Sequence, residues 1–386
     1  MSHWDSWVQS ELEGVRRNGR WRKLIAYDGA DVTGKVDGRD IVTFASNDYL
    51  GLASHPQVRA AAHEAIDRWG TGATASRLIV GTRPVHLELE AAIAKWKKTE
   101  RALVFPNGFG ANLTVMATLG VAGTIFSDAL NHASIIDGCR LAAASVKVFR
   151  HADADHLESL LLSAAGPKIV VTDAVFSMDG DVAPLQAIAA LCVRHDALLI
   201  VDEAHAVFDL DMPGLAGLQM LRVGTLSKTL GALGGWVAGS AAMIDLLINR
   251  GRAFIFTTGL SPADAAAGLA ALRIYRSEEG DALRRRLRVL VDQLIVGHPS
   301  PIIPVILGEE GVAVAAAQRL LDAGLWVPAI RPPTVPVGTA RLRIALSTAH
   351  TDAMVQRLKG VLIEQLPALK SGDIPHFLSA QCARRK

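Results

Sequence analysis

The sequence predicts an α/β fold, with a large domain built on a mostly parallel sheet flanked by helices and a smaller C-terminal α+β domain. Two observations predict it. From about residue 85 to residue 240, short apolar runs alternate with amphipathic stretches of helical period. Half of the residues are hydrophobic and a fifth are charged, which excludes a disordered or fibrous chain. Because right-handed crossovers through helices join parallel strands, this repeated order implies a largely parallel sheet.

Each expected strand is followed by an expected helix. In order, the pairs are RALVF with GFGANLTVMATL, GTIFSD with HASIIDGCRLAA, VKVF with DADHLESLLLSA, and KIVVTDAVFS with PLQAIAALCVRH, before the last run ALLIVDEAH. After about residue 250 a long helical stretch leads to PIIPVIL, a helix at about 311–323, LWVPAI, ARLRIAL and a last helix. We therefore expect an N-terminal arm at 1–50, the large domain at 51–250, and an interdomain helix with the smaller domain at 251–386.

Composition narrows the function classes. The net charge is +2, with dispersed cations apart from short clusters, so nothing in it demands a nucleic acid partner. Apolar runs stay below the roughly 18 to 20 residues of a membrane helix, and the N-terminus lacks the apolar core of a signal peptide, so we expect a cytoplasmic protein. The widely separated Cys139, Cys192 and Cys382 favour reduced thiols, without disulfides or a metal site.

Lys228 is the charged residue of the stretch LRVGTLSKTLGALGGWVAG, between an apolar run and a glycine-rich run. An exposed turn lysine is the simpler interpretation. The neighbouring hydroxyls of Thr225 and Ser227, and glycines that let the backbone approach a ligand, favour a site for a phosphate-bearing ligand instead.

Asp202 ends the apolar run ALLIV, and ligands of parallel sheets bind at the carboxyl ends of strands. DEAH could be the magnesium-binding motif of a helicase, but that function needs an upstream phosphate loop. The closest match, GADVTGKV, has Val36 where Ser or Thr must bind magnesium. An aspartate and a lysine at one cleft suit pyridoxal phosphate, because the lysine binds its aldehyde and the aspartate keeps the pyridine nitrogen protonated.

Further residues of the same strand ends could complete such a site. His132 begins a helix and could stack on the cofactor ring, although a solvent-facing histidine at a helix start is the alternative. His205, three residues after Asp202, could hydrogen-bond the phenolic oxygen of the cofactor. Gly108 and Phe109 begin a helix whose amides suit a phosphate, and Thr225 could add a hydroxyl to the same phosphate.

With these residues the chain resembles the α-oxoamine synthases, fold-type I pyridoxal-phosphate enzymes with an aminotransferase-like fold. The resemblance covers nearly the whole chain, through the blocks FASNDYLGL, GTGATASRLIVGT, NGFGAN, SDALNHASIIDGCR, VVTDAVFSMDGDVAPL, LLIVDEAH, GTLSKTLGALGG, FIFTTGLSP and IRPPTVPVGTARLRIALSTAH. The last block points to the branch of the family that acts in biotin synthesis. The loop after His205 departs from the family pattern, since it is shorter and has Ala206 where the family has glycine.

The resemblance implies a role for each matching residue. It makes Lys228, His132 and Asp202 catalytic. The residues it assigns to the cofactor besides these are His205 and Ser177 at the phenolic oxygen, Gly108, Phe109 and Thr225 chiefly at the phosphate, and Thr257 and Thr258 at the phosphate of a partner subunit in a shared dimer site. Those it assigns to substrate are Asn47 near the reacting groups, Arg331 and Arg343 at a carboxylate, and Arg22 at the end of the acyl chain. A surface or interdomain salt bridge is the alternative for each arginine.

The implied reaction condenses L-alanine with a pimeloyl thioester of coenzyme A or acyl carrier protein, with loss of carbon dioxide, to 8-amino-7-oxononanoate. The implied assembly is a homodimer. A sibling enzyme that joins glycine or serine to another acyl-CoA is the alternative within the family. A non-catalytic relative is a further alternative, but it would be expected to lose Lys228 or Asp202, and both are present.

Overall fold

The computed structural model describes residues 1–208, 210, 212 and 214–365 and divides them into two compact units. The larger unit comprises residues 46–302 and 346–349, and the smaller unit comprises 1–45, 303–345 and 350–365. Each unit therefore joins segments that are distant in the sequence. The sequence analysis expected domain boundaries near residues 50 and 250. That division stays a prediction.

A seven-stranded sheet forms the centre of the larger unit, in the order β3-β9-β8-β7-β6-β4-β5. Its strands are β3 (Arg101–Phe105), β4 (Thr124–Asp128), β5 (Val146–Phe149), β6 (Lys168–Asp173), β7 (Ala197–Asp202), β8 (Met220–Thr225) and β9 (Gly235–Gly239). The strands from β8 to β5 are parallel, whereas β9 is antiparallel to both of its neighbours. The predicted α/β class with a mostly parallel sheet is thus confirmed.

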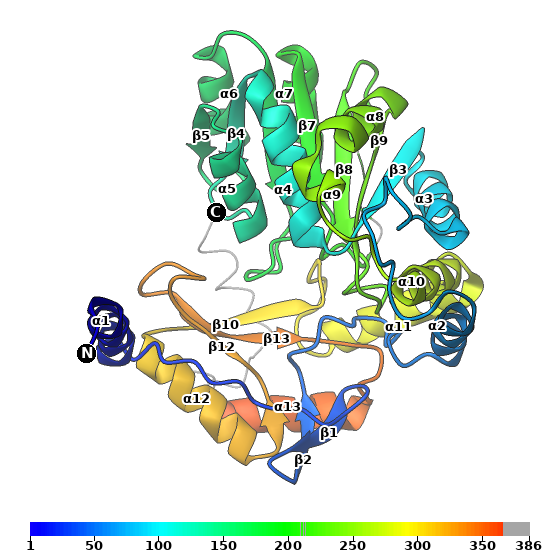
Figure 1. The fold of residues 1–386 in the computed structure, drawn as a ribbon. Helices are drawn as coiled ribbons and strands as arrows, with labels where there is room; N and C mark the ends of the chain where they lie inside the picture. Colours follow the sequence, from blue (N-terminus) through cyan, green and yellow to red (C-terminus); the bar gives the residue numbers. More distant parts are fainter. Residues whose placement is uncertain (209, 211, 213, 366–386) are drawn as a thin grey trace. The chain divides into compact units, whose positions relative to one another are not determined.

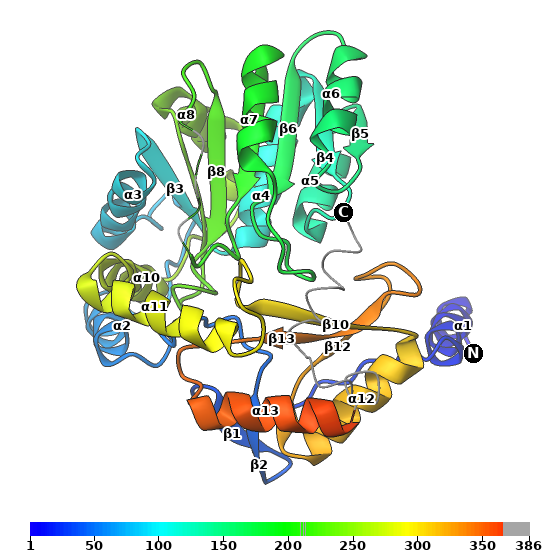
Figure 2. The ribbon, with the colours of Figure 1, turned by 180° about the vertical axis from the view of Figure 1, so that it is seen from behind.

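Helices cover both faces of this sheet (Figures 1 and 2). On one face the core is formed with α4 (Gly108–Leu119), α5 (Ala133–Leu141) and α8 (Ala241–Arg250), and on the other with α6 (Ala154–Leu162) and α7 (Leu185–Arg194). In β6, Ile169 and Val171 pack into the first core and Val170 into the second. A strand covered on both faces must be apolar at every position, which explains the continuous run KIVV.

The other helices of the larger unit flank this arrangement. They are α2 (Pro56–Trp69), α3 (Pro84–Lys97), η1 (Gly120–Ala122), α9 (Arg252–Ile255), α10 (Pro262–Tyr275) and α11 (Glu278–Asp292). The thiols of Cys139 in α5 and Cys192 in α7 are buried and unpaired, and burial raises their pKa values to about 11 and about 12. Cys382 lies outside the described residues.

The smaller unit contains two three-stranded sheets, in the orders β1-β2-β11 and β10-β13-β12. Its elements are α1 (His3–Arg17), β1 (Thr33–Val36), β2 (Arg39–Thr43), β10 (Ile302–Gly308), α12 (Glu310–Asp322), β11 (Leu325–Trp326), β12 (Ala329–Ile330), β13 (Ala340–Ala345) and α13 (Asp352–Gln365). Its strands and helices give the α+β character expected of the C-terminal region. Among the helices of the described residues, none is long and apolar enough to cross a membrane.

Candidate active site

A cavity of about 260 Å³ lies at the carboxyl ends of the central strands of the larger unit. Its lining comprises Asn107, Gly108, Phe109, Asn112, His132, Ser134, Asp173, Asp202, Ala204, His205, Gly224, Thr225, Ser227 and Lys228. The strand ends of β6, β7 and β8 and the start of α4 thus meet at one place, as the rule for parallel sheets predicts.

Lys228 lies in the loop between β8 and β9. The loop turns sharply, because the amide of Gly231 donates to the Lys228 carbonyl at 3.0 Å and Gly231 has a φ of +62°. A Cβ at Gly231 would lie 2.3 Å from the amide nitrogen of Ala53, so only glycine fits. The half-buried lysine amine lies 2.8 Å from Nε2 of His205.

His205 connects this amine to a distant segment of the chain. Its Nδ1 lies 2.7 Å from the hydroxyl of Tyr49, and that hydroxyl is 3.1 Å from Oδ1 of Asn47. Asn47 and Tyr49 both belong to the FASNDYLGL block, and the Tyr49 ring is fully buried. Four side chains therefore form a continuous hydrogen-bonded series ending at the Lys228 amine.

Both oxygens of the Asp202 carboxylate accept hydrogen bonds. Oδ1 accepts the amide of Ala204 at 2.9 Å, and Oδ2 accepts Nδ2 of Asn112 at 2.6 Å. The residue is 4% exposed, and it ends β7 at the same level as Asp173 in β6. A carboxylate oxygen can accept more than one hydrogen bond, so this buried carboxylate can also pair with a cationic ring nitrogen.

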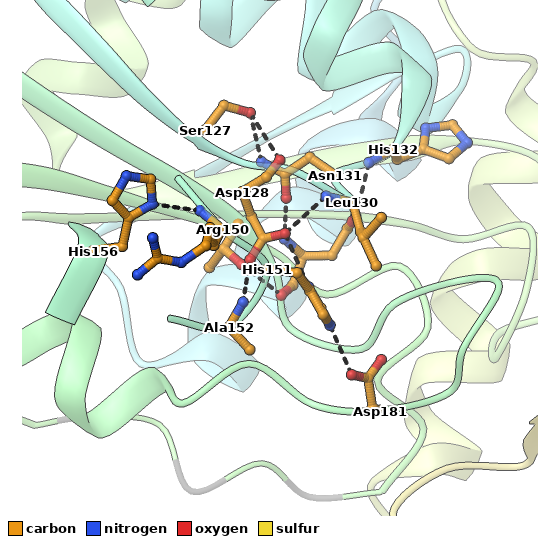
Figure 3. Close-up of polar contacts among 12 residues, drawn as sticks. Ser127, Asp128, Leu130, Asn131, His132, Arg150, His151, Ala152, His156 and Asp181 are labelled. Carbon is orange, nitrogen blue, oxygen red and sulfur yellow. Dashed lines mark hydrogen bonds and ion pairs between the residues drawn. The ribbon is translucent and has the colours of Figure 1, made fainter. Parts of the chain in front are cut away.

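The turn that carries His132 is built by hydrogen bonds from β4, β6 and the segment after β5 (Figure 3). Asp128 accepts the amides of Leu130 at 2.8 Å and Ala152 at 2.9 Å. The Asn131 side chain donates to Val171 O and accepts the amide of Asp173. The amide of His132 itself donates to Oδ2 of Asp173 at 2.8 Å. These contacts fix the backbone from which the His132 ring extends.

The surroundings of His132 make its ring a neutral one. Nδ1 accepts the amide of Ser134 at 3.2 Å and lies 2.7 Å from the Ser134 hydroxyl, which itself accepts Nδ2 of Asn112. A nitrogen that accepts from a backbone N–H carries no proton, so the ring proton lies on Nε2. Burial lowers the pKa of His132, and the charge of Lys228 lowers it further against the opposing effect of Asp202.

Asp173 adds a second carboxyl group beside Asp202. Complete burial raises its pKa well above the ordinary value, and the nearby charge of Asp202 raises it further. Both effects favour the protonated form of the Asp173 carboxyl group. Asp173 and Asp202 both line the cavity together with Lys228.

The opposite end of the cavity is formed by the start of α4 and the end of β8. Asn107 caps the helix by accepting the Gly110 amide at 2.7 Å, and the preceding amides of a helix have no acceptor within it. A Cβ at Gly108 would lie only 3.2 Å from Cβ of Thr225, so the helix start and the strand end lie in close contact. The Thr225 hydroxyl is 2.7 Å from that of Ser227. Amides, hydroxyls and the helix dipole suit an anion here.

A family model described as "Aminotransferase class I and II" matches residues 39–362. The chain belongs to this family. Its similarity to curated relatives extends over nearly the whole length. It is 46% identical to the 8-amino-7-oxononanoate synthase of Anaeromyxobacter dehalogenans (strain 2CP-1 / ATCC BAA-258), over 94% of this chain and 96% of the relative. It is 44% identical to the enzyme of the same name from Geobacter sulfurreducens, over 91% and 95%. The resemblance found in the motifs is thereby confirmed.

Several solved structures share this fold. A Sphingomonas wittichii serine palmitoyltransferase has a TM-score of 0.84 at 32% identity, covering 94% of this chain and 97% of that one. An 8-amino-7-oxononanoate synthase from Francisella tularensis has a TM-score of 0.70 at 26% identity, covering 85% and 98%. A structure described as "SPT with PLP internal aldimine" has a TM-score of 0.86 at 29% identity, covering 96% and 100%.

The donor set of the cavity fits the cofactor expected for this family. Asp202 offers a buried carboxylate for the pyridine nitrogen, Lys228 an amine for the aldehyde, and His132 a flat neutral ring. Gly108, Phe109 and Thr225 border the anion-binding end. The structure thus brings together all three expected catalytic residues, with His205 beside Lys228. Each assignment to a cofactor atom stays a prediction.

Other expected residues lie elsewhere in the described chain. Half-buried Ser177 belongs to the turn after Phe176, which is closed by hydrogen bonds from Phe176 to Asp181 and from Gly180 to Phe176, and it is outside the cavity lining given above. Thr257 and Thr258 are exposed after α9, and Thr258 pairs with Ser76.

The expected substrate arginines belong to the smaller unit. Arg22 is exposed, Arg331 donates to the carbonyls of Gly19 and Trp21, and Arg343 is buried in β13. The short loop after His205 continues through Ala206 to Phe208, while residues 209, 211 and 213 lie outside the described residues.

The sequence analysis assigned no role to four residues of the site, whose contacts are given above: Tyr49, Asn112, Ser134 and Asp173. The spacing of Asn112 and Ser134, each just inside a helix start beside a predicted site residue, was an available signal. Asp173 ends a predicted strand, as Asp202 does, and this was a second available signal. Tyr49 offered no comparable signal, because its partner His205 is far away in the sequence.

Proposed function

We propose that this chain is a pyridoxal-phosphate-dependent acyltransferase that condenses L-alanine with a pimeloyl thioester and releases carbon dioxide and 8-amino-7-oxononanoate, a step of biotin synthesis. One observation carries this proposal: the Lys228 amine and the buried Asp202 carboxylate line one small cavity with the neutral ring of His132. The names of the relatives, at 44% to 46% identity, support the choice of reaction.

When bound, the cofactor supplies an electron-accepting ring that stabilises negative charge on the amino-acid α-carbon. Asp202 holds a proton on the pyridine nitrogen, with its carboxylate oriented by Asn112 and Ala204. Lys228 would hold the aldehyde of the cofactor through its amine, and the same amine would take the α-proton of alanine. His132 would stack on the ring and exclude water from it, and His205 would hydrogen-bond the phenolic oxygen.

The remaining assignments follow the family pattern. Thr225 and the amides of Gly108 and Phe109 bind the phosphate, and Ser177 joins His205 at the phenolic oxygen. The protein acts in the cytoplasm as a homodimer in which Thr257 and Thr258 reach the partner's phosphate; their exposure after α9 supports this. Asn47 lies near the reacting groups, Arg331 and Arg343 bind a substrate carboxylate, and Arg22 binds the end of the pimeloyl chain.

A direct assay tests the reaction. The purified protein is incubated with pyridoxal phosphate, L-alanine and either pimeloyl-CoA or the pimeloyl carrier protein, and the product and the released thiol are measured together. We expect one thiol per 8-amino-7-oxononanoate formed, and loss of both in Lys228→Ala. Thiol release without that product would contradict the proposed reaction.

A sibling activity is the second candidate, because the serine palmitoyltransferase structure from Sphingomonas wittichii has a higher TM-score than the synthase structure from Francisella tularensis. The same assay with L-serine or glycine and a long-chain acyl-CoA separates the two candidates. Faster thiol release with serine and palmitoyl-CoA than with alanine and a pimeloyl thioester would favour the sibling.

A further inference from the structure

We propose that Tyr49, held by Asn47, is a positioning residue that keeps the proton of His205 on Nδ1, so that Nε2 accepts a proton from the Lys228 amine. This inference rests on the proposed role of Lys228 in binding the cofactor aldehyde. It adds to that role the group that frees the amine of its proton before the aldehyde arrives.

The direction of the hydrogen bonds carries the argument. Oδ1 of Asn47 is an acceptor only, so at 3.1 Å the Tyr49 hydroxyl donates to it. The hydroxyl has a single proton and thus meets Nδ1 of His205, at 2.7 Å, as an acceptor. Nδ1 must then carry the ring proton. The lone pair of the neutral ring is left on Nε2, which faces the Lys228 amine at 2.8 Å.

The turn that carries Asn47 and Tyr49 is held rigidly. The Asp48 carboxylate accepts the amides of Leu52 and Ala53, at 2.9 and 3.0 Å. The backbone carbonyl of Tyr49 accepts the amide of Thr348 at 2.9 Å. Because Gly231 in the lysine loop packs directly against Ala53, the turn and the loop keep a fixed separation. These contacts therefore fix the position of the backbone that carries the Tyr49 hydroxyl.

The proton transfer is balanced within these residues. An N–H bond of the Lys228 ammonium breaks, an N–H bond forms at Nε2 of His205, and the positive charge moves from the amine to the imidazole. The resulting imidazolium still donates from Nδ1 to Tyr49, which in turn donates to Asn47, so the other hydrogen bonds keep their direction. The lysine is left as a neutral amine, the form that attacks an aldehyde.

Several charged or titratable groups surround this transfer. Asp202, Asp173 and His132 line the cavity with Lys228 and His205. Arg288 of α11 lines a neighbouring cavity that also includes His205. Glu203, next to Asp202, is already paired with Lys97 and Arg222. The test therefore compares variants that leave all of these charged groups unchanged.

Tyr49→Phe and Tyr275→Phe form a matched pair for this test. Tyr275 is also buried in the larger unit, and its hydroxyl donates to the carbonyl of Val207 at 3.1 Å, two residues after His205. The rate at which apoprotein captures pyridoxal phosphate is followed by absorbance as a function of pH. We expect capture by Tyr49→Phe to be roughly tenfold slower near neutral pH and to recover at higher pH, and capture by Tyr275→Phe to match the wild type. Equal profiles for the two variants would overturn the proposal.

The tautomer gives a readout that lost stability alone does not change. In apoprotein labelled with ¹⁵N-histidine, with His205→Leu used to assign the signal, we expect the proton on Nδ1 in the wild type and on Nε2 in Asn47→Leu. That variant leaves the Tyr49 hydroxyl free to donate to the ring, so it should shift the capture profile as Tyr49→Phe does. It also serves if Tyr49→Phe does not fold. A wild-type proton on Nε2 would refute the proposal.

A double substitution separates this proposal from the proposed function. If Tyr49 acts through His205, then Tyr49→Phe has no further effect on capture in a His205→Leu background, whereas independent, multiplying effects would contradict the relay. The role of Lys228 is tested apart from Tyr49 by Lys228→Ala. Undiminished capture by Lys228→Ala would overturn the proposed function, whatever the Tyr49 variants show.

Discussion

The turn after β4 carries His132 and is bonded through Asp128 to His151 (Figure 3), yet the surroundings leave His132 neutral and His151 positively charged. The ring of His132 accepts a backbone N–H at Nδ1, and burial with the charge of Lys228 lowers its pKa. Nδ1 of His151 lies 3.0 Å from Asp128, and its Nε2 lies 2.8 Å from Asp181. Burial opposes the charge on His151, but the two carboxylates outweigh burial and raise its pKa to about 10.

The difference shows how the fold assigns a task to each histidine. His132 faces the cavity, where a flat neutral ring is needed. His151 lies against Phe176 and ties Asp128, at the start of the turn, to Asp181, in the loop that follows Ser177. The charged His151 thus helps to hold the turn that carries the neutral His132.

Removal of His151 should have the largest effect on stability. His151→Leu leaves the fully buried Asp128 carboxylate without its cationic partner, although two backbone amides still donate to it. We expect the free energy of unfolding to fall by about 3 kcal/mol, measured by chemical denaturation at neutral pH. A loss of less than about 1 kcal/mol would mean that the amides alone satisfy Asp128.

His195→Leu is the matched control for this prediction. His195 is also largely buried, but among the described residues its one ion-pair partner is Glu158, at 3.5 Å, and that residue pairs with Arg194 as well. We expect a clearly smaller loss of stability than for His151→Leu. Equal losses in the two variants would show that side-chain packing outweighs the charge of His151.

The two histidines should also give stability opposite dependences on pH. The pKa of His151 is raised, so its stabilisation is complete below the unfolded value of about 6.5 and is lost as the pH rises toward about 10. The pKa of His132 is lowered, so its effect is a loss of stability as the pH falls below about 6.5. Over the alkaline range we expect the difference between wild type and His151→Leu to shrink by on the order of 2 kcal/mol.

Unfolding curves of wild type, His151→Leu and His132→Phe at a series of pH values test these signs. His132→Phe should remove part of the acid-side loss and leave the alkaline side unchanged. If the stability difference for His151→Leu grows with rising pH, the assigned charge of His151 is wrong.

The sequence predicted the parts of the molecule that depend on local pattern. The order of strands and helices, and the gathering of Lys228, Asp202, His132 and His205 at strand ends, follow from periodicity and from the rule for parallel sheets. The contacts that set protonation could not be predicted in the same way. Tyr49 meets His205, and His151 meets Asp181, through tertiary packing between segments that share no local pattern.

We expect the smallest effect for Asp173→Asn, which tests how the backbone of His132 is held. The carboxyl group of Asp173 accepts the His132 amide at 2.8 Å, and burial beside Asp202 raises its pKa well above the ordinary value. A protonated carboxyl group and a carboxamide are similar in shape and both accept a hydrogen bond, so Asp173→Asn should change the unfolding free energy by less than about 1 kcal/mol and largely keep the reaction rate. Asp173→Leu leaves the His132 amide without its acceptor and should cost about 2 kcal/mol. Equal, large losses in both variants would contradict a protonated Asp173.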